Sequence, residues 1–225
     1  MPLNIRFDRD TLLMLGATLL PLLGVIFAGW SPYALLAFYW FETFVIGIWM
    51  LIFILASPRQ PVGLLSNPNQ PMHSGPGLAL FVLAHAGMFM GVHLFFLYNV
   101  FGEGFIRPGD GLVESLLGLL FDEGLWLPLL GFFLVRGLVT VDALRHQERI
   151  DRHLIGFYYR IVVMQLAIIF GGMFALVLGP LAGVITLLAV RVAFELSIPS
   201  VEDYVEAHFA KLKQDISKRR GSGAK

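Results

Sequence analysis

A few titratable side chains interrupt a sequence that is otherwise almost wholly apolar between Thr11 and Leu196. They lie inside or at the ends of long apolar runs and are Glu42, His85, His93, Arg136, Arg160, Arg191 and Glu195. A charged side chain in hydrocarbon costs about 2.5–3.5 kcal/mol even on lenient insertion scales. Such residues are kept where they pair, line water or bind a ligand. We therefore expect an internal polar site able to carry protons, hold an ion or bind an anionic group.

The composition is that of a helical membrane protein. Of 225 residues, 57% are hydrophobic and only 14% are charged, whereas soluble domains have about 25% charged residues. The formal net charge is zero, which gives no indication of a nucleic-acid partner. The chain has no cysteine, and this excludes disulfides, thiolate metal sites and cysteine nucleophiles.

Runs of about 20 apolar residues predict six transmembrane helices. We expect an all-α, polytopic membrane helix bundle over residues 1–198, followed by a cytoplasmic juxtamembrane tail with an amphipathic helix over 199–225. The short apolar segment 111–121 is too short to span and either lies in the interface or re-enters the membrane. The expected spans are Thr11–Ala28, Tyr33–Ala56, Gly77–Val100, Gly124–Val141, Ile155–Leu178 and Leu181–Leu196.

Lysine and arginine gather in alternate loops and thereby predict the orientation. One side holds Arg59, the run Arg145, Arg149 and Arg152, and the basic C-terminal tail, whereas the opposite 101–123 loop is acidic. We expect a multi-pass inner (plasma) membrane protein with both termini cytoplasmic. The basic tail suits anionic inner-leaflet lipids, or is an ordinary solvated tail. The sequence leaves a homo-oligomer open.

Helical rise sets the depth of each polar residue. Glu42 and His93 fall in the outer half of the bilayer, where they form a predicted pair and candidate proton relay. His85 is about 12 Å deeper than His93 on the same helix. It joins a predicted lower cluster with excess positive charge: Arg136, Arg160, Gln165, Arg191 and Glu195. The bland alternatives are helix-locking hydrogen bonds and snorkelling arginines.

Three functions remain open from these residues. The first is ion- or proton-linked binding or transport of a small solute. The second is a membrane-embedded metal-dependent enzyme or redox protein with a metal ion on His93, Glu42 or His85. The third is a structural or assembly protein. The sequence has no GxSxG and no HExxH, which argues against a serine hydrolase of that type and a zincin-type site. It does not decide whether the protein is an enzyme.

Four segments resemble an uncharacterised prokaryotic family of six-helix integral membrane proteins, a domain of unknown function. These segments are WSPYALLAFYWFETFVIG, HAGMFMGVH, RIVVMQLAIIFGG and RVAFEL. The residues to which the resemblance points are Trp40, Glu42, His85, His93, Arg160, Arg191 and Glu195. Gln165 stands where the family pattern has histidine, and Arg191 and Glu195 stand where it has lysine and aspartate. The resemblance implies a shared site and no particular activity.

Overall fold

The computed structural model describes three continuous stretches of the chain and scattered positions beside them. The stretches are residues 29–62, 73–101 and 109–179, and the scattered positions are 16, 24, 27, 182–183, 185–190, 192–194, 196–197, 204 and 207. Within them the chain is all-helical and forms no strand, although Pro61 and His73 make one isolated bridge.

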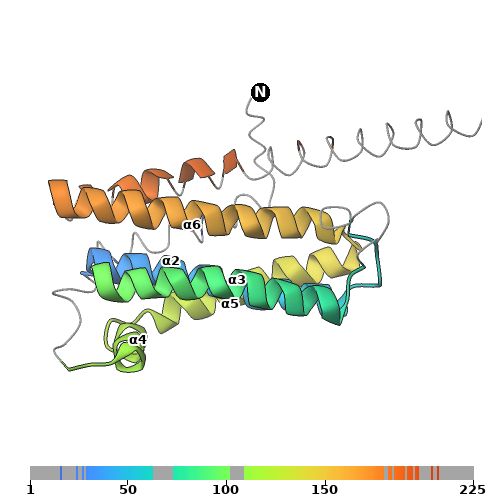
Figure 1. Ribbon diagram of the computed structural model, residues 1–225, viewed down its shortest axis with the longest axis horizontal. Helices are drawn as coiled ribbons and strands as arrows, with labels where there is room; N and C mark the ends of the chain where they lie inside the picture. The colour runs from blue at the N-terminus through green and yellow to red at the C-terminus, as the bar shows by residue number, and fades with distance from the viewer. Residues whose placement is uncertain are drawn as a thin grey trace, which may run out of the picture.

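The helices follow one another in simple chain order (Figure 1). They are α2 (Pro32–Ala56), α3 (Pro76–Phe96), the π-helical extension η1 (Leu97–Phe101), α4 (Leu112–Phe121), α5 (Trp126–Arg145) and α6 (Ile150–Leu178). Four of these, α2, α3 with its extension, α5 and α6, are long and apolar enough to cross a membrane. This agrees with the membrane class expected from composition.

Local sequence explains where the helices begin and end. The Ser31 hydroxyl accepts a hydrogen bond from the Ala34 amide at 3.1 Å, which caps α2 ahead of Pro32. The same helix ends because Ser57 precedes a proline and is extended, with ψ 145°. At the far end of the chain, α6 stops at Gly179, whose φ of +97° suits glycine and not a side chain.

The predicted spans agree with the structure to different degrees. Those at Tyr33–Ala56 and Gly77–Val100 are confirmed within one or two residues. The next begins at Trp126, since Gly124 has a positive φ of +74° and cannot continue a helix. The following span begins at Ile150, five residues before the predicted Ile155, with Asp151 in a first turn that favours an acidic side chain.

The predicted count of six spans is not confirmed. The expected first span, Thr11–Ala28, lies outside the described residues apart from positions 16, 24 and 27. Within the expected span Leu181–Leu196, residues 185–190 and 192–194 are helical. The tail over 199–225 lies outside the described residues except for Tyr204 and Ala207, which are helical.

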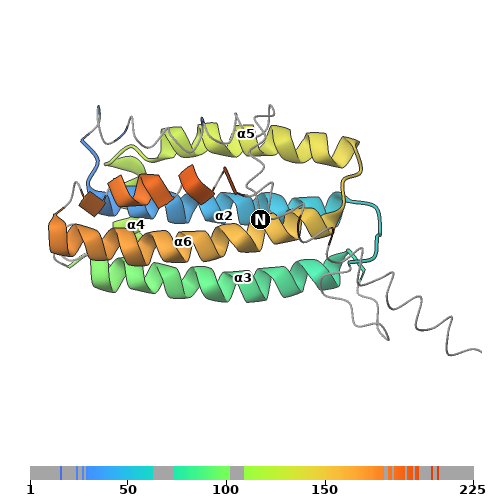
Figure 2. The same cartoon turned by 90° about the horizontal axis from the view of Figure 1, so that it is seen from above.

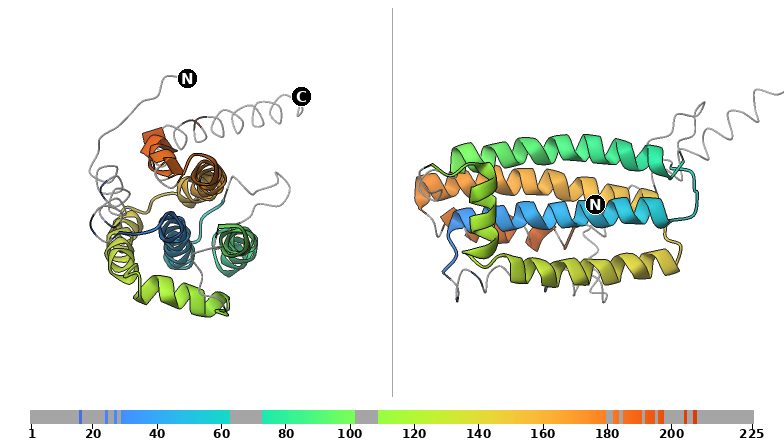
Figure 3. Two further views of the ribbon diagram at one scale, coloured as in Figure 1. Left: turned by 90° about the vertical axis from the view of Figure 1, so that its left-hand side faces the viewer. Right: turned by 90° about the horizontal axis from the view of Figure 1, so that it is seen from below.

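Helix α2 is the centre of the bundle. It packs against α3, α5 and α6, and the end-on view shows it between α5 on one side and α3 on the other (Figure 3). The view from above also places α2 and α6 between α5 and α3 (Figure 2). The two hydrophobic core clusters both run along α2, around Phe38 and around Phe53. Most side chains of α2 are therefore shielded from lipid by neighbouring helices.

Helix α4 lies crosswise to the long helices at one end of the bundle (Figure 3). We call this the α4 end, and the opposite end, with the α5–α6 loop, the hairpin end. Ser115 and Leu119 of α4 are buried, whereas Val113, Leu117 and Phe121 are exposed. A short helix placed across the bundle end with an exposed apolar face favours the interfacial alternative for segment 111–121.

Candidate buried polar site

Glu42 lies in the middle of the protein core. Its side chain is on α2 and the residue is only 1% exposed, among the buried aromatic residues Phe38, Tyr39 and Trp40. Taking a carboxylate out of water disfavours its charged form. A glutamate at this position is therefore expected either to bind a proton or to meet a positive group.

Two tryptophans define which face of α2 carries Glu42. The indole of Trp40 donates to the Met90 carbonyl at 2.9 Å, so Trp40 faces α3. Glu42, two residues further, is rotated by about 200° and lies on the opposite face. Trp49, seven residues beyond Glu42, returns to within about 20° of it and donates to the Phe133 carbonyl of α5 at 3.1 Å. Glu42 thus lies on the α2 face turned away from α3, the face on which Trp49 meets α5 and Phe53 meets His153 of α6.

His93, on α3, is as deeply buried as Glu42. It is 1% exposed, and neither ring nitrogen has a hydrogen-bond partner in the described part of the chain. The predicted Glu42–His93 pair is therefore not joined by a hydrogen bond. The depth estimate was compatible with a contact, but the rotation of Glu42 about α2 points it away from α3. A buried polar group with no partner costs about 1–3 kcal/mol, so His93 calls for a functional or structural explanation.

His85 is held by α6. Its Nδ1 lies 3.2 Å from the hydroxyl of Tyr158, and its ring stacks on Phe81 at a centroid distance of 5.4 Å. Phe89 completes an aromatic surround on the same helix at 5.2 Å. The sequence analysis did not identify Tyr158 as a partner of His85. Its position one turn after Leu154 on an apolar helix was a signal that its side chain faces another helix. This arrangement fits the helix-locking alternative for His85.

The contact between His85 and Tyr158 also fixes the register of α3 against α6. Both helices run from the hairpin end to the α4 end (Figure 1). Gln165 lies seven residues beyond Tyr158 and His93 eight beyond His85, or about 10 and 12 Å along their axes. Gln165 repeats the facing of Tyr158 within about 20°. The structure thus brings half-buried Gln165 to the level of His93, a juxtaposition that the sequence did not predict.

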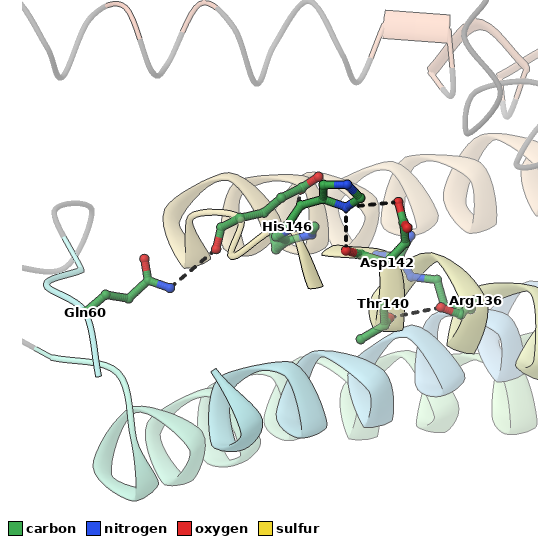
Figure 4. A network of polar contacts seen from close by, with 7 residues as sticks. Gln60, Arg136, Thr140, Asp142 and His146 are labelled. Atoms are coloured by element: carbon green, nitrogen blue, oxygen red, sulfur yellow. Dashed lines mark hydrogen bonds and ion pairs between the residues drawn. The ribbon is translucent and has the colours of Figure 1, made fainter. Parts of the chain in front are cut away.

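The predicted lower cluster is divided between two sides of α2. Arg136 is a half-buried residue of α5, and its carbonyl accepts from the Thr140 hydroxyl at 2.9 Å (Figure 4). His85 is on α3, with α2 between these helices (Figure 3). Arg160 is half-buried on α6. Arg191 and Glu195 lie outside the described residues.

The described residues contain no group of three or more His, Cys, Asp or Glu side chains that could hold a metal ion. His85 and His93 are about 12 Å apart along α3, and Glu42 lies on the far face of α2. The metal site predicted from these three residues is therefore not assembled in the described structure.

A polar network at the hairpin end joins α5 to α6. A carboxylate oxygen of Glu148 lies 2.8 Å from Nε2 of His153. This hydrogen bond lowers the pKa of Glu148 below its ordinary value of 4.5. Arg149 bonds Asp151 at 2.9 Å. Figure 4 shows His146 against Asp142, and Gln60 reaching the loop from the end of α2 through the Glu148 carbonyl. These contacts fix the α5–α6 turn.

Comparison with known proteins identifies the family and nothing closer. Residues 3–217 match a family of unknown function (DUF6498). The chain belongs to this family. No curated protein and no solved structure matches it. Membership confirms the resemblance to an uncharacterised family and adds no activity, so any function has to be argued from the buried residues themselves.

Proposed function

We propose that this member of DUF6498 is an integral membrane protein that binds a proton or small ion at Glu42 and couples this binding to transport of a small solute. The burial of Glu42, on the central helix of a bundle whose long helices can cross a membrane, carries the proposal. A buried carboxyl can take up and release a proton or hold a small cation. A carboxyl kept at this depth is a recurrent feature of proton pathways.

His93 and Gln165 support a second polar position on the pathway. They lie at a similar depth on α3 and α6, and the imidazole of His93 is buried with no hydrogen-bond partner in the described residues. The two ring nitrogens of an imidazole can accept a proton on one side and donate one on the other. Arg136, Arg160 and, outside the described residues, Arg191 remain candidates for attracting an anionic group, with Glu195 as the predicted partner of Arg191.

Charges at the two ends of the bundle support the orientation that goes with this function. The hairpin end carries the described arginines Arg59, Arg145, Arg149 and Arg152, whereas the α4 end carries Asp110, Glu114, Asp122 and Glu123. By the positive-inside rule the hairpin end is cytoplasmic. With the predicted spans over residues 11–28 and 181–196 added, this orientation leaves both termini of an inner-membrane protein in the cytoplasm.

The test is a comparison of Glu42→Gln with Glu114→Gln, an exposed glutamate of α4. We expect wild-type protein in liposomes to dissipate a pH gradient, Glu42→Gln to lose that flux, and Glu114→Gln to retain it. Infrared spectra across the titration should show a protonated carboxyl band that disappears only in Glu42→Gln. Wild-type flux no greater than that of empty liposomes, or flux unchanged in Glu42→Gln, overturns the proposal.

A further inference from the structure

A groove runs between α2 and α3, with a ring from α6 at its floor. Its volume is about 310 Å³. Trp40 and Phe44 stack at 5.6 Å as one wall, Gly87 and Gly91 line the α3 side, and Phe157 lies beneath. An added Cβ at either Gly87 or Gly91 would meet nothing within 4 Å. These two glycines therefore leave room that any larger residue would fill.

The polar side chains that line the groove are already engaged within the protein. The indole of Trp40 donates to the Met90 carbonyl at 2.9 Å, and the hydroxyl of Thr43 donates to the Tyr39 carbonyl at 3.0 Å. The other lining residues are glycine, alanine, aliphatic, methionine and phenylalanine. The side chains of the groove offer no spare donor to a polar ligand, which favours an occupant made of hydrocarbon.

The length and position of the groove match one leaflet of a bilayer. Lining residues run from Trp40 to Leu51 on α2 and from Val82 to Gly91 on α3, or about 16 and 13 Å along the helices. The hydrocarbon core of a bilayer is about 30 Å thick, so one leaflet contributes roughly half of that. Leu51 is five residues from the end of α2. The groove therefore begins about 7 Å from the hairpin end.

We propose that this groove binds one acyl chain of a membrane phospholipid from the leaflet at the hairpin end. A second copy of the chain is the main rival, because exposed glycines four residues apart also suit helix pairing. A helix is about 10 Å across, too wide to enter a groove of this volume. The site is separate from Glu42, which lies on the opposite face of α2, and it stands whether or not the protein moves protons.

Photo-crosslinking in lipid vesicles tests the site. The probe is a phosphatidylcholine that carries a diazirine within one acyl chain. We expect adducts to gather on Met90 and Phe44, several-fold above those on Leu138 of α5, although Leu138 is the most exposed of the three at 72%. Gly87→Leu, which fills the groove, should remove most of this excess. Ala84→Leu, at an exposed position of α3 outside the groove, should keep it.

Two results overturn the inference. One is an adduct pattern that follows surface exposure alone, or that persists in Gly87→Leu protein of unchanged helix content. The other is a disulfide-linked dimer formed by Gly91→Cys in dilute vesicles, since the natural chain has no cysteine and such a bond would place a second copy on the groove. Monomeric Gly91→Cys protein together with the expected adducts supports the bound acyl chain.

Discussion

Helices α2 and α3 are similar in length and almost equally apolar, but they occupy different surroundings. Half of the most apolar stretch of α2 is buried inside the protein, against 28% of that of α3. Helix α2 packs against three long neighbours, whereas α3 turns residues such as Leu80, Val92 and Phe95 outward. An apolar sequence makes a helix stable in a non-aqueous environment. Packing decides how much of that environment is neighbouring protein and how much is lipid.

The polar residues of the two helices follow the same division. On α2, Glu42 and Thr43 are adjacent and both buried, although they point to different faces. On α3, His93 is buried but His85 is only partly covered, within its aromatic surround. The central helix can thus keep a carboxyl away from lipid on most of its surface, although Phe44 and Leu55 are exposed, while less of the peripheral helix is protected.

The largest expected effect comes from truncating a phenylalanine on each helix. Phe38 of α2 is fully buried, and Phe38→Ala should lower the free energy of unfolding by about 3–5 kcal/mol because it leaves a cavity. Phe95 of α3 is 63% exposed, and Phe95→Ala should cost about 1 kcal/mol or less. Detergent-titration unfolding in mixed micelles measures both. Equal losses would show that α3 is not peripheral in the folded protein.

Substitutions at two glycines should give effects of intermediate size and test the same comparison between α2 and α3. A Cβ added to Gly137 of α5 would lie 2.5 Å from the ring of Trp49, which its hydrogen bond to Phe133 holds in place. Gly137→Ala should therefore destabilise the α2–α5 contact by about 1–3 kcal/mol. Gly87→Ala on α3 meets open space and should be neutral or stabilise by up to about 1 kcal/mol. Unfolding curves with the opposite ranking would contradict the packing around α2.

The smallest effect is expected away from both helices, in the α5–α6 loop. The contact with His153 lowers the pKa of Glu148, so its stabilisation is present above the ordinary value of 4.5 and is lost as the pH falls through the folded pKa. Glu148→Gln should lower the melting temperature slightly at neutral pH and leave it unchanged in acid, so that the loss of thermal stability on acidification is flatter in the variant. Because the Glu148 side chain is 39% exposed, the difference should be at most about 1 kcal/mol. Melting temperatures that fall equally steeply in the variant would contradict it.

Much of the fold could be predicted because its causes are local. Ser31 and Pro32 specify the start of α2, and Ser57 before a proline specifies its end. Long apolar runs identified four described helices able to cross a membrane, with boundary errors of a few residues at Gly124 and Ile150. The number of spans was harder to predict than their type, and six is not confirmed. Depth along a helix also follows from counting residues, since the rise is constant.

The candidate site required the tertiary structure because depth says nothing about rotation. Glu42 and His93 were predicted to pair from their depths, yet the bond from Trp40 to Met90 turns Glu42 away from α3. The register that places Gln165 level with His93 depends on the contact between His85 and Tyr158, which no local pattern encodes. By itself the sequence determined the medium, the helices and the buried residue types. Packing alone decided which faces meet, because each helix can satisfy its apolar surface against lipid as well as against another helix.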